Sequence, residues 1–315
     1  MPNRDQLKSL LRDEQAVTEL RERLSDHRFR AIVVNDEEAG ILEQKIGYPI
    51  PEKVVLQQGR PSLFVRGDSY EEAALDTWKE RLASARQSIQ RILPSVGRVE
   101  FRNHPTFDWN GTAWMIGPSV MVTNRHVAML FAERRDSHFV FRTNPSGKII
   151  KATVDLKEEH GLPDERELTV REILHIEDDR SDCPDVAFVK VDIPDDGMPP
   201  EPIPLATSEL RSQDLVAVIG YPSFDPDELP SVARRIFEGV YAVKRLSPGM
   251  IINPNESDSF SFTHDCTTMG GSSGSVVISL TTGEALGLHY AGVSRAANYA
   301  VHAAFLKRLY RQYCA

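Results

Sequence analysis

The apolar positions of this chain follow two different periods, one on each side of Pro94. Upstream, they recur every three or four residues as far as Leu24, which predicts a first helix. A second helix is predicted from Ser69, which has capping-box spacing to Glu72, up to Pro94. The glycines and prolines of residues 26–67 indicate short elements joined by turns.

Short β-type runs replace this pattern from Val96 onward. They are separated by turn signals and read GRVEF, TAWMI, SVMVT, HFVFR, IIKATV, DVAFVKV, LVAVIGYP, GVYAVKRL, GMIIN, SVVISL, ALGLHYAG and NYAVH. Few helix-length segments lie between them, which favours an all-β barrel or sandwich over βαβ units. The last segment, AAFLKRLYRQY, places its apolar side chains on one face and predicts a closing helix.

Three parts are therefore expected. They are a mainly helical interaction or regulatory region at residues 1–68, a connecting helix at 69–94 and a β domain at 95–315. The length of 315 residues and the hydrophobic content of 41% suffice for a sizeable core. A net charge of −9 argues against a nucleic-acid partner.

The cysteines indicate a reducing compartment. Cys183, Cys266 and Cys314 are too few and too scattered for a disulfide framework, and no pair has the spacing of a metal site. His160 and His175 also lack such spacing, and we expect the acidic stretch EEHGLPDERE to be a solvated loop. The N-terminus has no signal-peptide pattern, and no apolar run approaches the ~18 residues of a membrane span. We therefore expect a cytoplasmic protein without membrane contact or bound metal.

Candidate chemistry lies in CTTMGGSSGSVVIS, where two serines stand among glycines. A nucleophilic serine needs a histidine base, a carboxylate that orients the histidine, and donors for the oxyanion. VMVTNRHVA leads from an apolar strand into His126, and CPDVAFVKV places Asp185 at the start of another strand. The order His, Asp, Ser is one of the few in which such triads occur.

Three blocks carry a resemblance to a known family. GTAWMIGPSVMVTNRHVA, DVAFVKV and GGSSGSVV resemble, in order, the histidine, aspartate and nucleophile blocks of the chymotrypsin-like serine peptidases. They are most similar to the bacterial branch that includes the staphylococcal glutamyl endopeptidase and the HtrA-type proteases. The resemblance covers residues 96–315 and implies a double antiparallel β-barrel. It also implies peptide-bond hydrolysis through an acyl-enzyme, with no metal or organic cofactor.

The Gly-x-Ser-Gly unit of that family selects Ser273 as nucleophile, with the amides of Gly271 and Ser273 as the oxyanion hole. Ser272 offers an alternative, since it fits the G-x-S-x-G elbow of α/β-hydrolases. That fold needs its acid and histidine downstream, where too little chain remains. Animal trypsins carry an activation aspartate before the nucleophile, so Ser272 implies that this form of zymogen control is absent.

The resemblance also implies a specificity pocket. Glutamyl endopeptidases have a threonine or serine where Thr268 falls here, and a histidine where His289 falls. A hydroxyl and an imidazole can hydrogen-bond a carboxylate, so we expect cleavage after glutamate. Tyr290, Ala291 and Gly292 are expected to pair with an extended protein or peptide substrate.

Two functional classes stay open. The first is a regulated intracellular bacterial effector protease, whose N-terminal region recruits or restrains it. The second is a catalytically silent protein-binding module on a peptidase fold. Each residue alone also has an ordinary interpretation, such as a half-buried histidine or a flexible glycine turn. The intact set of residues favours the enzyme.

Overall fold

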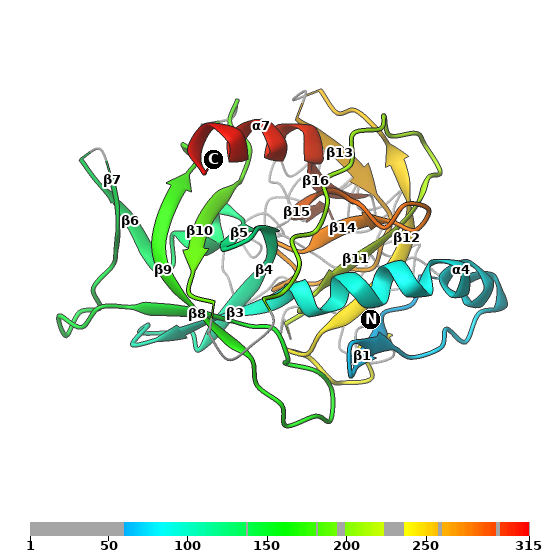
Figure 1. Ribbon diagram of the computed structural model, residues 1–315, viewed down its shortest axis with the longest axis horizontal. Coiled ribbons are helices and arrows are strands. Elements are labelled where there is room, and N and C mark those ends of the chain that lie inside the picture. Colours follow the sequence, from blue (N-terminus) through cyan, green and yellow to red (C-terminus); the bar gives the residue numbers. More distant parts are fainter. Residues whose placement is uncertain are drawn as a thin grey trace, which may run out of the picture.

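The protein folds into two antiparallel β-barrels, with one helix before them and one after (Figure 1). This computed structural model describes residues 60–136, 138–180, 182–193, 199–223, 236–257, 260–293 and 297–314. The predicted helix ending near Leu24, and with it the mainly helical character of the N-terminal region, lies outside the described residues. In the part that is described, no helix combines the length and apolar content of a membrane span.

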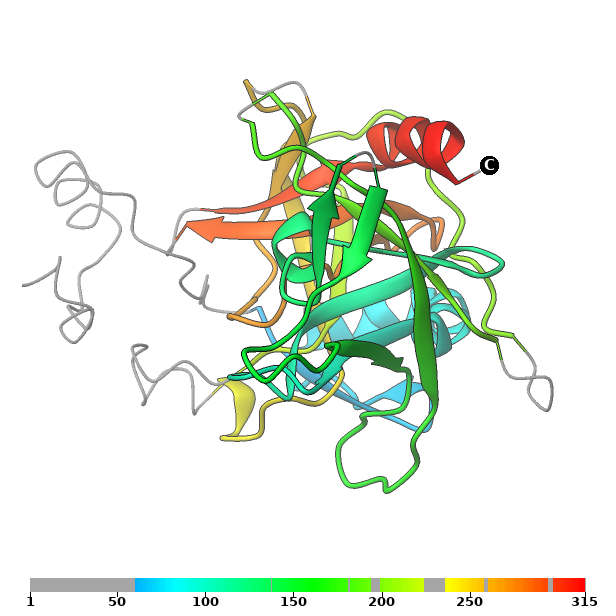
Figure 2. The same cartoon turned by 90° about the vertical axis from the view of Figure 1, so that its left-hand side faces the viewer.

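The first barrel closes in the order β10-β5-β4-β3-β8-β9. Its strands are β3 (Val96–Arg102), β4 (Trp109–Gly117), β5 (Val120–Thr123), β8 (Lys151–Asp155), β9 (Glu167–Ile176) and β10 (Ala187–Val191). A hairpin of β6 (Ala132–Arg135) and β7 (His138–Phe141) accompanies this barrel, which faces the viewer in Figure 2. Alternate side chains such as Val99, Phe101 and Met115 point inward and form one apolar core.

The second barrel has the order β11-β14-β15-β16-β13-β12, and a pairing of β11 with β12 closes it. Its strands are β11 (Leu215–Gly220), β12 (Arg245–Asn253), β13 (Ser261–His264), β14 (Val276–Ser279), β15 (Ala285–Val293) and β16 (Ala297–His302). The strand β1 (Leu63–Arg66) pairs with β12, and β2 (Ser69–Tyr70) pairs with β1. The described chain therefore begins on this second barrel.

These observations confirm the all-β fold and the chymotrypsin-like double barrel. The closing helix α7 (Ala303–Tyr313) coincides with the predicted segment. The predicted start of the second helix was wrong, because α4 (Asp76–Ile92) begins seven residues after Ser69. Ser69 instead pairs with Arg66 of β1, so its apparent capping box with Glu72 is not used.

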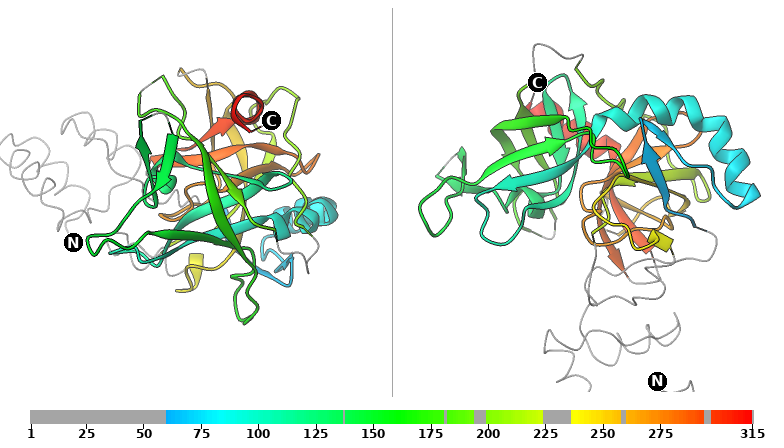
Figure 3. Two further views of the ribbon diagram at one scale, coloured as in Figure 1. Left: turned by 60° about the vertical axis from the view of Figure 1, so that its left-hand side comes forward. Right: turned by 90° about the horizontal axis from the view of Figure 1, so that it is seen from below.

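The apolar cluster that contains the helix α4 and the 3-10 turn η1 (Leu93–Ser95) also includes side chains of the first barrel, and the helix itself packs against the second barrel. Trp78, Leu82 and Ile89 are buried in the same apolar cluster as Ile219 and Leu246. Figure 3 shows the helix lying along that barrel. A chain that began near Pro94 would therefore lose part of this core. The functional division at residues 68 and 94 stays a prediction.

A buried charge network joins the two barrels. The Lys244 ammonium donates to the carbonyls of Leu93 at 2.9 Å and Leu156 at 2.7 Å, and lies 3.6 Å from Glu159. Burial lowers the pKa of Lys244 to about 8, although the Glu159 charge opposes this shift. Glu159 is only 2% exposed. Residues 161–165 of its acidic stretch are exposed, as expected of a solvated loop, whereas Glu159 is an exception that the charges of Lys244 and Lys157 hold inside.

Candidate active site

The register of the first barrel brings His126 and Asp185 together. His126 lies in α5 (Arg125–Ala128), directly after β5, and Asp185 lies directly before β10. Thr123 of β5 pairs with Ala187 of β10, so both residues leave the sheet at the same edge. The His126 Nδ1 is 2.6 Å from Asp185 Oδ2, and the His126 amide donates to Oδ1 at 3.1 Å.

This contact fixes the orientation of the imidazole. Asp185 holds the ring and the main chain of His126 with separate oxygens, while Asn124 donates to the Asp185 carbonyl at 2.8 Å. The aspartate side chain is 14% exposed and the histidine side chain 45%. The carboxylate is thus shielded, whereas the imidazole faces solvent, as a group that exchanges protons with a substrate must.

Ser273 lies in the loop between β13 and β14, which is shaped by two glycines with positive φ. Gly271 has φ +80° and Gly274 has φ +85°. A Cβ on Gly271 would lie 2.8 Å from the Tyr221 carbonyl, and one on Gly274 would lie 2.0 Å from the Thr112 carbonyl. The loop therefore requires glycine at both positions, for conformation and for space.

The first barrel holds this loop through β4. The Thr112 amide donates to the Ser273 carbonyl at 2.8 Å. A Cβ on Gly111 would lie 2.7 Å from Val127 and 3.2 Å from that same carbonyl. Gly111 therefore lies against both the helix that carries His126 and the loop that carries Ser273. The structure thus brings the three predicted triad residues to the junction of the barrels.

The loop distinguishes the two serines. The Ser272 hydroxyl accepts a hydrogen bond from the Met269 amide at 3.2 Å, and its own amide donates to the Met269 carbonyl at 2.9 Å. Ser272 thus closes a local turn. The all-β fold also removes the α/β-hydrolase context that a nucleophile elbow at Ser272 would need.

The amides that flank Ser273 differ in their use. Those of Ser272 and Gly274 donate to the Met269 and His289 carbonyls, both at 2.9 Å. Within the described part of the chain, the Gly271 amide donates to no protein acceptor. An unengaged N–H on a loop that glycine bends this way can receive an oxyanion.

Thr268 and His289 are both buried beside this loop. The Thr268 hydroxyl donates to Asn298 Oδ1 at 2.7 Å, and Asn298 Nδ2 donates to the Cys266 carbonyl at 2.6 Å. Burial lowers the pKa of His289 to about 3, and the charge of His126 acts in the same direction.

The stretch from Tyr290 to Gly292 extends beyond the neighbouring strand β14, whose pairing with β15 ends at Leu288. On its other side β15 pairs with β16 as far as Ala297. The Tyr290 hydroxyl lies 2.9 Å from Ser261 Oγ. One edge of this stretch therefore lies beyond its sheet neighbour, as β-augmentation by a substrate requires.

Two residues of this region were not predicted. Asn298 is fully buried between Thr268 and Cys266, and an asparagine inside the β-type run NYAVH was the available signal. His264 is also fully buried, 5.5 Å from the His289 ring centroid and edge-on to it. Burial lowers its pKa well below the ordinary value. Neither of its ring nitrogens has a hydrogen-bond partner among the described residues.

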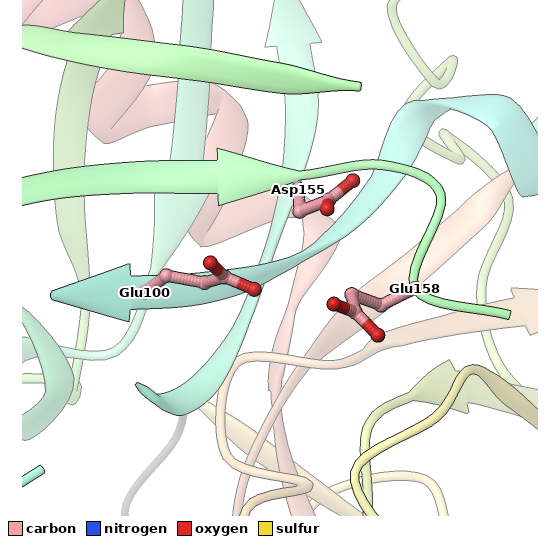
Figure 4. A group of neighbouring side chains, drawn as sticks. All are labelled: Glu100, Asp155 and Glu158. Atoms are coloured by element: carbon pink, nitrogen blue, oxygen red, sulfur yellow. The ribbon is translucent and has the colours of Figure 1, made fainter. Parts of the chain in front are cut away.

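Among the described residues, one group of carboxylates has the spacing of a metal site. Figure 4 shows its members, Glu100, Asp155 and Glu158. The Arg98 guanidinium lies 2.6 Å from Glu100 and 2.7 Å from Glu158. An arginine thus already supplies the positive charge that this group needs. His160 stacks on Phe64 and lies outside the group.

Residues 111–288 match the family model of the trypsin-like peptidase domain. A protein of Lysobacter enzymogenes described as a probable serine protease is 24% identical over 328 residues, covering 92% of this chain and 81% of that protein.

Two solved structures are also similar. The crystal structure of Deg5 has a TM-score of 0.49 and 19% identity, covering 75% of this chain and 95% of that one. The crystal structure of a serine endoprotease from Yersinia pestis has a TM-score of 0.48 and 16% identity, covering 72% and 65%. Because the family model spans more than half of the sequence, the chain belongs to the family of trypsin-like peptidase domains.

Proposed function

We propose that this protein is a serine endopeptidase whose triad is His126, Asp185 and Ser273. The observation that carries the proposal is the junction of the barrels. The first barrel supplies a hydrogen-bonded His126–Asp185 pair, and its Thr112 amide also holds the loop that presents Ser273. This is the arrangement that a hydroxyl nucleophile needs for activation.

In this mechanism His126 accepts the Ser273 proton while Ser273 attacks the scissile carbonyl of a protein substrate. Asp185 holds the imidazole tautomer and stabilises its charged form. The amides of Gly271 and Ser273 receive the oxyanion, and removal of one such donor typically costs ~10²- to 10³-fold in rate. His126 then protonates the leaving amine, and water hydrolyses the acyl-enzyme.

Fluorophosphonate labelling tests the proposal, because the reagent reacts with activated serines. We expect the wild type and Ser272→Ala to label, and Ser273→Ala not to label. Ser272→Ala is the matched control, since it removes a hydroxyl from the adjacent residue of the same loop. An unlabelled wild type would instead favour the silent protein-binding module.

We also propose cleavage after glutamate. Thr268 and His289 support this preference, since both are buried beside the nucleophile loop, one on each side of it in sequence. A library of peptides that differ only in the residue before the scissile bond measures it directly. Cleavage after arginine, phenylalanine or alanine instead would contradict it.

The residues before Arg60 are proposed to regulate this site in a cytoplasmic protein. Arg60 forms a bidentate ion pair with Asp265, at 3.0 and 2.6 Å, and its carbonyl accepts from Thr267 at 2.8 Å. The N-terminal region is thus attached beside Thr268. The test compares full-length protein with a chain that begins at Arg60, which keeps α4. Higher activity of the shorter chain would indicate restraint, and equal activity would indicate recruitment.

A further inference from the structure

A surface cavity of about 540 Å³ lies between the helix α7 and the segment that leads into the second barrel. Ala206 and Thr207 form one wall, and five residues of α7 between Ala304 and Gln312 form the other. None of these residues belongs to the triad or to the nucleophile loop. The volume lies within the range of ~300 to 1,000 Å³ that is usual for small-molecule sites.

The barrels hold both walls of this cavity in place. The Ala206 amide donates to the Ala285 carbonyl of β15 at 2.9 Å. Leu306 and Leu309 anchor α7 in the apolar core, and the Tyr313 ring stacks on His175 of β9 with 3.5 Å between the centroids. Figure 1 shows α7 lying across the outside of the barrels. The cavity therefore exists before any ligand binds, as most small-molecule sites do.

The cavity is basic, although the protein as a whole carries a net charge of −9. Lys307, Arg308 and Arg311 line it, and α7 contains no acidic residue. Within the described part of the chain, no carboxylate pairs with any of the three. Lys307 and Arg311 are also four residues apart, a spacing at which like charges repel each other on a helix. A bound anion would remove this repulsion.

The helix dipole accounts for only one of these cations. Arg311 lies in the last turn of α7, where the partial negative charge of the helix end stabilises it. Lys307 and Arg308 lie one turn earlier, and the effect of the dipole falls off within the last turn. Lys307 is in addition only partly exposed. The Arg308 guanidinium lies over the Phe305 ring, 4.4 Å from its centroid, which restricts its position without using its N–H groups.

We propose that this cavity binds a small molecule that carries two or more adjacent phosphate groups. An arginine guanidinium matches a phosphate with two parallel N–H donors, and a lysine adds a point charge. The Thr207 hydroxyl and the Gln312 amide are further donors at the same cavity. Because the three cations lie within about one helical turn, a single compact polyanion can contact all of them. Binding of this kind is separate from peptide-bond hydrolysis.

Titration calorimetry of the full-length protein with pyrophosphate and with orthophosphate tests the proposal. At 0.15 M salt the Debye length is ~8 Å, so the cations of the cavity outweigh the distant acidic residues. We expect pyrophosphate to bind at least about tenfold more tightly than orthophosphate, because it makes more charged hydrogen bonds. No binding of pyrophosphate, or equal affinities for the two ions, would overturn the proposal.

Substitutions assign the binding to the cavity. Lys307→Gln, Arg308→Gln and Arg311→Gln should each weaken pyrophosphate binding by about tenfold. Glutamine has a helix propensity close to those of lysine and arginine, so α7 should still form. The dipole at this end of the helix disfavours an anion, which leaves the side chains to bind it.

The matched control removes the same charge from other exposed positions. It combines Lys148→Gln, Lys151→Gln and Lys190→Gln, and we expect it to keep the affinity of the wild type. The corresponding triple variant of the cavity should show no measurable binding. An equal loss in both triple variants would overturn the proposal, because the overall charge and not the cavity would then attract the anion.

Two further probes distinguish the source of the anion. If ADP binds at least as tightly as pyrophosphate, the ligand is an organic diphosphate, and if ADP binds more weakly, it is the inorganic ion. Both results support a phosphate site. A hexaglutamate peptide that binds the cavity more tightly than pyrophosphate and ADP would overturn the proposal in favour of an acidic protein partner.

Discussion

The buried pair His264 and His289 predicts a loss of stability in mild acid. Both rings are neutral in the folded protein, because burial lowers each pKa, that of His289 to about 3 from an ordinary value of 6.5. In the unfolded chain both would be protonated below that ordinary value. The unfolded state then binds more protons than the native state, so the free energy of unfolding falls as the pH falls below about 6.5.

The size of the effect for His289 follows from its pKa of about 3 in the folded protein and its ordinary value of 6.5 in the unfolded chain. At pH 5 an unfolded histidine is almost fully protonated, while His289 in the native state is not. Lowering the pH from 7 to 5 therefore removes roughly 2 kcal/mol through His289, and the lowered pKa of His264 adds a loss of the same sign. The usual total stability of a folded domain is ~5 to 15 kcal/mol. The pair alone thus removes a large part of it.

The assay is urea unfolding, followed by tryptophan fluorescence, of the wild type and His264→Phe at pH 7 and pH 5. The substitution removes one of the two titrating groups and two unpaired buried nitrogens. At pH 7 we expect the variant to be at least as stable as the wild type. Between the two pH values its free energy of unfolding should fall by less than that of the wild type. Equal losses would refute the argument, because they would mean that His264 binds the same number of protons in both states.

Three further substitutions follow from the contacts around the site. Gly274→Ala would place a Cβ 2.0 Å from the Thr112 carbonyl at φ +85°, so fluorophosphonate labelling should fall by at least ~10²-fold. Asp185→Asn keeps the shape but supports the wrong imidazole tautomer; kcat should drop by roughly 10⁴-fold, and an unchanged kcat would contradict the triad. Lys244→Met removes the fully buried partner of Glu159 and leaves it only the partly exposed Lys157 ammonium at 3.8 Å, so it should destabilise by up to about 3 to 5 kcal/mol in urea, whereas adding Glu159→Gln should restore much of that loss.

Much of the fold could be predicted because most strands either alternate apolar and polar residues or are continuous apolar runs bounded by turn residues. β9 was missed, since ELTVREILHI exposes charged side chains between its buried ones and follows an acidic loop. β12 was divided in two, because Pro248 and Gly249 look like a turn. In the structure both pair with β11 in a continuous ladder. The strand pairing that closes the barrel therefore overrides the local preference of Pro248 and Gly249 for a turn.

The triad residues could be predicted because their motifs occur in a fixed order along the chain. Such motifs carry no information about the side chains that pack around them in the folded protein. His264 lies in β13, which no β-type run had identified, and its burial depends on strands from the whole second barrel. The partnership of Glu159 with Lys244 joins residues far apart in sequence. The partner of the Thr268 hydroxyl is Asn298, whose orientation is set by the Cys266 carbonyl. Contacts of this kind follow only from tertiary structure.

Thr112 has a consequence for how the protein could be switched. Its amide holds the Ser273 carbonyl, its carbonyl accepts from Thr123 Oγ1, and its hydroxyl accepts from the Tyr221 amide. The bonds to Ser273, at 2.8 Å, and to Tyr221, at 3.2 Å, join the two barrels directly at the nucleophile loop, while the bond to Thr123, at 2.7 Å, fixes Thr112 within the first barrel. A ligand or partner could therefore silence the protein from a distance by rotating one barrel slightly against the other. Such a rotation would inactivate the protein without any ligand bound at the catalytic residues.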